Sequence, residues 1–276
     1  MKVYLAQMKP HLGVVEKNID EMVKFIERAI EDSAELVLFP ELCLTGYLLE
    51  DLVYDLASSK IPKELLELSK KVSIIFGGVE LSNDFYVYNT AYYLENGELK
   101  GKHRKVYLPT YGMFDEGRYF KSGDSIKAFD TKFGKIGMLI CEDAWHQSSH
   151  QILAQDGANY IFVLTSSPAR VVGENLEIAH SWDSILKSSA ICNSVYVAMC
   201  NRVGVEDGCS FWGGSSVFEP SGKQLLKMNY FSEDMKLVDL KVDAVKRARF
   251  SSPVARNEKL DLILREFNRI NTTSDN

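Results

Sequence analysis

The stretch KIGMLICEDAW, residues 135–145, contains the pattern that is most informative about the fold, an apolar strand that ends at a reactive residue. A mostly apolar, strand-like run ends at Ile140 and is followed at once by Cys141, two acidic residues and a tryptophan. A reactive side chain placed at a strand-to-helix turn is typical of a nucleophile elbow. Neighbouring carboxylates raise the pKa of a thiol, so another group must help to form the thiolate. The alternative is a buried structural cysteine, and this segment alone favours neither interpretation.

The same alternation of strand and turn recurs along the chain. Apolar runs typical of buried strands cover residues 2–7, 35–39, 72–80, 134–140, 160–165, 195–201, 215–219 and 235–239. Helical spacing of apolar residues covers 18–33, 63–71, 150–156, 176–192 and 260–270. An Asn-Gly pair at 96–97 predicts a hairpin between 87–94 and 98–102. The sequence has no linker-like segment or repeat, so we expect one α/β domain over residues 1–276, with a mixed sheet or two sheets covered by helices.

Composition argues against several classes of function. The formal net charge is -6, which disfavours a nucleic-acid partner. No apolar run approaches the roughly 18 residues that span a bilayer. The apolar segment at the N-terminus is too short for a signal peptide, so we expect no membrane association and a cytoplasmic location. The chain has no CxxC motif, and four of its five cysteines are expected to be small apolar residues: Cys43, Cys192, Cys200 and Cys209.

A carboxylate follows another buried strand in LVLFPELCLTGY, residues 36–47. Here an apolar run reaches Pro40 and then Glu41. A carboxylate fixed beside a low-dielectric wall is suited to act as a general base. Taken alone, the segment is read more simply as a surface glutamate that opens a loop.

A basic cluster opens the third segment, GKHRKVYLPTYGMFDEGRYFKSGD, residues 101–124. Such clusters usually face solvent or contact phosphate. The apolar pattern after Lys105, however, would hold the stem of this side chain along a strand. A lysine held there can stabilise an oxyanion and offset the negative neighbours of a thiolate.

These segments together resemble the nitrilase, or carbon–nitrogen hydrolase, superfamily. The motifs FPE, RKVYLP and CEDAW occur in that family's order and with roughly its spacing, and LAQM near the N-terminus is similar to its opening strand. The segment YGMFDEGRYF, followed by SGD, is most similar to the glutaminase domain of glutamine-dependent NAD synthetases. The resemblance implies a four-layer αββα sandwich. It also implies a homodimer or higher homo-oligomer, with residues 240–276 as a C-terminal arm suited to the dimer interface.

The resemblance also implies a role for each reactive residue. Cys141 would attack a carbonyl or nitrile carbon, and Glu41 would take its proton and later activate water. Lys105 would stabilise the oxyanion together with a backbone N–H just after the cysteine. Glu116 matches a second glutamate that orients the lysine. No ligand cluster with metal-binding spacing occurs, so neither a metal nor another cofactor is expected.

The substrate pocket is less well defined by the sequence. Glu142 matches the acid that contacts the substrate amino group in the glutaminase relatives, and Ser167 matches a serine that helps to hold glutamine. The sequence departs from these relatives after Ser167, where Arg170 either binds a substrate carboxylate from a new position or faces solvent. Four aromatic residues close to the reactive positions are expected as pocket walls, with core packing as the alternative: Tyr47, Tyr111, Phe114 and Trp145.

The leading hypothesis is a thiol-dependent amidase that acts on a small amide or N-carbamoyl compound and releases ammonia. A nitrilase acting on a C≡N group ranks below it, because CEDAW is more similar to the amidase and glutaminase branches. The sequence contains no glycine motif of an ATP-using synthetase domain. The second hypothesis is therefore a glutaminase subunit that supplies ammonia to a separate synthetase partner. The third, a non-catalytic metabolite-binding scaffold, is disfavoured because binding alone needs no base, lysine and thiol together.

Overall fold

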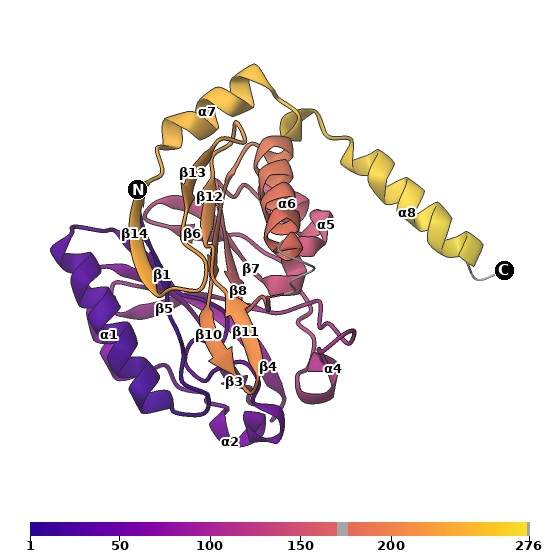
Figure 1. The fold of residues 1–276 in the computed structure, drawn as a ribbon. Helices are drawn as coiled ribbons and strands as arrows, with labels where there is room; N and C mark the ends of the chain where they lie inside the picture. Colours follow the sequence, from indigo (N-terminus) through magenta and orange to yellow (C-terminus); the bar gives the residue numbers. More distant parts are fainter. Residues whose placement is uncertain (170–175, 275–276) are drawn as a thin grey trace.

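The computed structural model describes residues 1–169 and 176–274, and its two central β-sheets lie between helices (Figure 1). The first sheet has the strand order β14 (Asp234–Asp239), β1 (Lys2–Gln7), β2 (Leu36–Leu38), β3 (Ser73–Leu81), β4 (Val87–Glu95), β5 (Glu98–Arg104). The second has the order β13 (Gln224–Lys227), β12 (Ser216–Phe218), β9 (Tyr196–Asn201), β8 (Tyr160–Thr165), β7 (Gly134–Ile140), β6 (Phe129–Thr131). Each sheet pairs its central strands in parallel and its outer strands antiparallel.

Helices lie on the outer side of both sheets, and only α8 extends away from them among the described residues (Figure 1). The longer helices are α1 (Val15–Glu31), α3 (Lys63–Leu68), α5 (Gln147–Gln155), α6 (Glu177–Asn193), α7 (Val242–Ser251) and α8 (Leu260–Ser274). The shorter ones are η1 (Glu50–Leu52), α2 (Val53–Leu56), α4 (Glu116–Tyr119), η2 (Cys141–Trp145) and η3 (Ala255–Asn257). A hairpin of β10 (Val203–Glu206) and β11 (Cys209–Trp212) stands beside the two sheets.

Strand alternation explains the layers. On β1, Val3 and Leu5 point into the core between the sheets, whereas Tyr4 and Ala6 pack in the cluster that includes buried residues of α1. Successive side chains of a strand point to opposite faces, so a strand that is apolar throughout must be covered on both sides. The predicted αββα sandwich with two mixed sheets is therefore confirmed.

Several predicted boundaries were wrong, and some elements were missed. Helix α1 begins three residues before the predicted start, and α5 begins at Gln147 rather than 150. The β10–β11 hairpin turns at Asp207 and Gly208, which both have positive φ, as do Asn96 and Gly97 in the hairpin that the sequence predicted. The Asp-Gly pair is thus the same type of signal and was overlooked. Helix α7 was missed because its sequence is rich in charge and only Val245 is buried.

The four cysteines that were expected to be small apolar residues differ in their burial. Cys43 and Cys200 are buried as expected, but Cys192 is exposed and Cys209 is partly exposed, so the expectation was wrong for those two.

None of the helices within the described residues is long and apolar enough to cross a membrane. Helix α8 extends away from the rest of the molecule (Figure 1), with Phe267 60% exposed. Its place in a dimer interface stays a prediction.

Candidate active site

Three strand ends from the two sheets bring the predicted reactive residues together. Glu41 follows β2 and Lys105 follows β5, both in the first sheet, and Cys141 follows β7 in the second. Because the sheets pack face to face, the residues beyond these strands meet at one edge of the interface between them. The surface-loop interpretation of Glu41 is excluded, since this side chain is fully buried.

A glycine on the neighbouring strand β3 makes room for the Glu41 turn. A Cβ atom built on Gly77 would lie 2.4 Å from the backbone nitrogen of Leu42 and 2.9 Å from the carbonyl oxygen of Pro40. Backbone atoms cannot move aside cheaply, so only glycine allows the turn to approach β3 this closely. Gly77 therefore fixes the position of Glu41 through direct backbone packing.

Lys105 lies between two buried carboxylates. Its Nζ is 2.9 Å from Glu41 Oε1 and 2.7 Å from Glu116 Oε1, and the lysine side chain is fully buried. Burial alone would lower the pKa of Lys105, but the charges of Glu116 and Glu41 outweigh it and raise this pKa well above its usual value. Burial raises the pKa of Glu116 to about 7, against the lowering influence of Lys105. The ammonium therefore stays charged and holds both carboxylates.

Further partners fix the two carboxylates, and two of them were missed by the sequence analysis. Asn89 Nδ2 donates to Glu41 Oε1 at 2.8 Å, and the backbone N–H of Ser166 donates to Glu41 Oε2 at 2.8 Å. The Tyr47 hydroxyl donates to Glu116 Oε1 at 2.5 Å. Asn89 and Ser166 come from β4 and from the end of β8, and no local motif marks either residue.

Cys141 occupies a sharp turn directly after β7. Its φ is +45°, a conformation that costs a residue with a side chain roughly 1–3 kcal/mol. The pKa of this thiol is raised well above its usual value by burial first and then by the charge of Glu41, which together outweigh the opposing influence of Lys105. The thiol is therefore protonated at rest, and a reaction through its sulfur requires a base to accept the proton.

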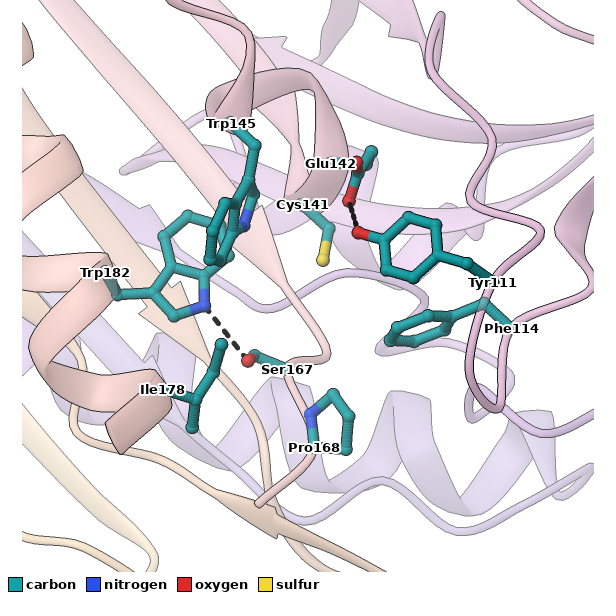
Figure 2. Close-up of a pocket in the computed structure, with 9 residues that line it drawn as sticks. All are labelled: Tyr111, Phe114, Cys141, Glu142, Trp145, Ser167, Pro168, Ile178 and Trp182. Carbon is teal, nitrogen blue, oxygen red and sulfur yellow. Dashed lines mark hydrogen bonds between the residues drawn. The ribbon is translucent and has the colours of Figure 1, made fainter. Parts of the chain in front are cut away.

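The thiol opens into a cavity of about 170 Å³. Figure 2 shows the Cys141 sulfur pointing into a space with two indole rings on one side and the rings of Tyr111 and Phe114 on the other. Five residues predicted to bind substrate line it: Tyr111, Phe114, Glu142, Trp145 and Ser167. Three more were missed, and they come from the segments after β8 and in α6: Pro168, Ile178 and Trp182.

Two polar groups in the cavity have defined partners. The Tyr111 hydroxyl donates to Glu142 Oε2 at 2.8 Å. Ser167 Oγ accepts hydrogen bonds from two indole N–H groups, those of Trp182 and Trp212, both at 3.0 Å. With both of its lone pairs engaged, the Ser167 hydroxyl keeps only its proton to offer.

The two remaining residues that were predicted to bind substrate are Tyr47 and Arg170. Tyr47 does not line this cavity, which corrects its prediction as a pocket wall. Its ring packs against Phe114 and Phe211, and its hydroxyl donates to Glu116. Arg170 lies outside the described residues.

Comparisons with known proteins identify the family of the chain. The family model for carbon–nitrogen hydrolases matches residues 2–250. The chain is 33% identical over 267 residues to a glutamine-dependent NAD(+) synthetase of Thermotoga maritima, covering 94% of this chain and 45% of that protein. It thus spans less than half the length of this relative. It is 32% identical over 263 residues to a probable nitrilase of Schizosaccharomyces pombe, covering 90% of this chain and 92% of the relative.

A solved structure shows the same fold. The carbon–nitrogen hydrolase of Helicobacter pylori superposes with a TM-score of 0.83 at 24% identity, covering 95% of this chain and 96% of that chain. At this level of identity the likeness concerns the fold alone. Together with the family match over nearly the whole sequence, it leads to one conclusion: the chain belongs to the carbon–nitrogen hydrolase family of the nitrilase superfamily.

Proposed function

We propose that this protein is a thiol-dependent amidase that hydrolyses a small amide or N-carbamoyl compound and releases ammonia. The observation that carries the proposal is the buried ammonium of Lys105 between Glu41 and Glu116, together with the Cys141 thiol at the wall of a cavity. Burying two carboxylates and an ammonium is costly, and packing alone would be achieved as well by apolar side chains. A base, a cation and a thiol at one point are what acyl transfer requires.

The first half of the reaction forms a thioester. Glu41 accepts the thiol proton while the sulfur of Cys141 attacks the carbonyl carbon, and the carbonyl π electrons move to its oxygen. The Lys105 ammonium and the backbone N–H after the cysteine stabilise this oxyanion. When the intermediate collapses, the C–N bond breaks and the leaving nitrogen takes the proton from Glu41 as ammonia leaves.

The second half regenerates the thiol. Water attacks the thioester carbon and gives a proton to Glu41, and the C–S bond breaks on collapse. The sulfur recovers its proton and the product leaves as a carboxylic acid or, from an N-carbamoyl compound, as a carbamic acid. One water is consumed and one ammonia released per turnover. Glu116 takes no part in bond changes here and serves to hold the lysine.

The cavity lining favours a small acyl group with polar ends. Its walls are largely aromatic, so they favour an apolar chain segment. Glu142 offers a carboxylate that suits an amino or other N–H group of the substrate. Ser167 offers a single O–H donor that suits a carbonyl or carboxylate oxygen.

The second candidate is a glutaminase subunit that supplies ammonia to a separate synthetase. It is supported by the similarity to glutamine-dependent NAD(+) synthetases. A glutamine substrate would place its amino group at Glu142, and the two candidates share the same chemistry at Cys141. They differ in whether the protein turns over fully without a partner.

The test is ammonia release by the purified protein over a panel of substrates. The panel holds glutamine, asparagine, ω-amides of keto acids, N-carbamoyl amino acids and amines, short aliphatic amides and nitriles. A strong substrate whose turnover is lost in Cys141→Ala supports the amidase. Glutamine turnover that rises only when a synthetase is added supports the subunit. Full activity of Cys141→Ala contradicts both.

A further inference from the structure

Asp143 is an acidic residue of the CEDAW turn that does not line the catalytic cavity. Its side chain is fully buried, whereas its neighbour Glu142 faces the cavity. A buried carboxylate is costly unless donors satisfy both of its oxygens. The partners of Asp143 therefore indicate what the residue does.

Four donors from two segments meet at this carboxylate. Oδ1 accepts from the backbone N–H groups of Val106 at 3.0 Å and Tyr107 at 2.9 Å. Oδ2 accepts from the backbone N–H of Ile140 at 3.1 Å and is 2.8 Å from Nε2 of His103. Both oxygens are thus engaged twice, and His103 must present an N–H at Nε2.

These four donors flank the two reactive residues that come from different sheets. Val106 and His103 lie on either side of Lys105 in sequence, and Ile140 immediately precedes Cys141. One carboxylate therefore fastens the end of β5 to the end of β7. A second contact joins the same two segments, because the ring of Tyr107 stacks on His146 with ring centroids 3.5 Å apart.

Asp143 is held as a carboxylate despite its burial. Burial alone raises the pKa of Asp143, but the hydrogen bond and charge of His103 and the backbone N–H groups of Tyr107 and Ile140 lower it below its usual value. Charge-assisted bonds of this kind are about twice as strong as neutral ones. They are suited to hold the left-handed backbone of Cys141, which the chain would otherwise relax.

We propose that Asp143, supported by His103, is a positioning residue that fixes the Cys141 turn relative to Lys105. The inference rests on the proposed function, because it assigns Asp143 the task of aligning the thiol with its base and the ammonium. Misplacing reacting groups by about 1 Å can lower a rate about 100-fold. Losing this carboxylate should therefore lower reactivity of the thiol well beyond any effect on folding.

The test measures alkylation of Cys141 by iodoacetamide, a small amide reagent, with peptide mass spectrometry. Exposed Cys192 in the same molecule serves as the internal standard. Asp143→Asn keeps the size of the side chain and the acceptor Oδ1 but turns an N–H₂ group toward Ile140 and His103. We expect the rate at Cys141 to fall about 10- to 100-fold while the rate at Cys192 is unchanged. An unchanged or faster rate at Cys141 overturns the proposal.

Further variants separate positioning from simple loss of stability. Glu80→Gln is the matched control. Glu80 is also a buried carboxylate, and it binds Lys102 and Arg104 of β5, the strand that carries His103. We expect it to lower stability and leave alkylation of Cys141 unchanged. His103→Leu should slow alkylation and His103→Gln, which keeps an N–H donor, should restore most of it. This pair decides the question if Asp143→Asn does not fold, and equal rates in the two overturn the proposal.

Failure of the proposed function would look different. In that case Cys141 of the unmodified protein would not react, or would react equally fast in Glu41→Gln. Reaction of the unmodified protein that depends on Glu41 but not on Asp143 would overturn only the positioning role.

Discussion

Replacing Lys105 with methionine should destabilise the protein in a way that depends on pH. The change removes the ammonium that lies 2.9 Å from Glu41 and 2.7 Å from Glu116 and leaves an apolar side chain of similar length. Removing one partner of a buried ion pair typically costs about 3–5 kcal/mol. Glu41 keeps the donors Asn89 and Ser166. Glu116 keeps the Tyr47 hydroxyl for one oxygen, and its other oxygen has no partner among the described residues.

The pH dependence follows from Glu116. Its pKa in the folded protein is already raised from 4.5 to about 7, so the folded state binds more protons than the unfolded state between those values. Stability therefore falls as pH rises through this window and levels off above about pH 7. Without Lys105 the pKa of Glu116 rises further, so the fall continues above pH 7 at up to about 1.4 kcal/mol per pH unit.

Urea unfolding followed by circular dichroism measures this difference. We expect Lys105→Met to lose about 3–5 kcal/mol near pH 8 and clearly less near pH 6, where Glu116 is protonated in both proteins. The double variant Lys105→Met/Glu116→Gln should lose the extra pH dependence. An equal loss at both pH values, or a double variant that keeps the slope, would refute the reasoning that the ammonium holds the charge of Glu116.

Three further predictions follow from other contacts. Ser167→Ala leaves two buried indole N–H groups without their acceptor, so the free energy of unfolding in urea should fall by about 2–4 kcal/mol and KM should rise. A fall below about 0.5 kcal/mol would contradict the role of this hydroxyl. Gly77→Ala forces a Cβ to within 2.4 Å of backbone, so it should destabilise the protein by about 1–3 kcal/mol and lower kcat for ammonia release; an unchanged kcat would show that Glu41 is not displaced. We propose a homodimer in which a second copy covers the apolar face of α8, because an isolated helix of this length is marginal in water. Phe267→Asp should then shift sedimentation toward the monomer, whereas Arg265→Asp should not, and a monomeric unmodified protein would contradict the proposal.

The ends of two strands were predictable, because the apolar run of β7 stops abruptly at Cys141 and that of β2 reaches Pro40 and then Glu41; a strand buried on both faces carries a continuous local signal. Lys105 follows the charged strand β5 and was found instead from the apolar pattern that comes after it. Strand β3 contains a Gly-Gly pair, but the need for Gly77 depends on the turn at Glu41, which packs against it from another part of the chain.

The rest of the site depends on long-range contacts that local patterns do not encode. Asn89 and Ser166 hold Glu41 across 48 and 125 residues of sequence. Trp182 is part of an ordinary buried helix face and reaches the cavity only because α6 packs beside the Cys141 turn. Tyr47 was assigned to the pocket from its closeness in sequence to Glu41, yet it is not among the residues that line the cavity and its hydroxyl donates to Glu116.

The most direct test of the covalent mechanism is mass spectrometry of the protein quenched in acid while it turns over its best amide. A thioester at Cys141 predicts a population heavier by the mass of the acyl group, with the added mass on the peptide that contains Cys141. It also predicts that neither the adduct nor ammonia release occurs in Cys141→Ala. Ammonia release that continues in Cys141→Ala, without any adduct in the unmodified protein, would contradict the covalent mechanism.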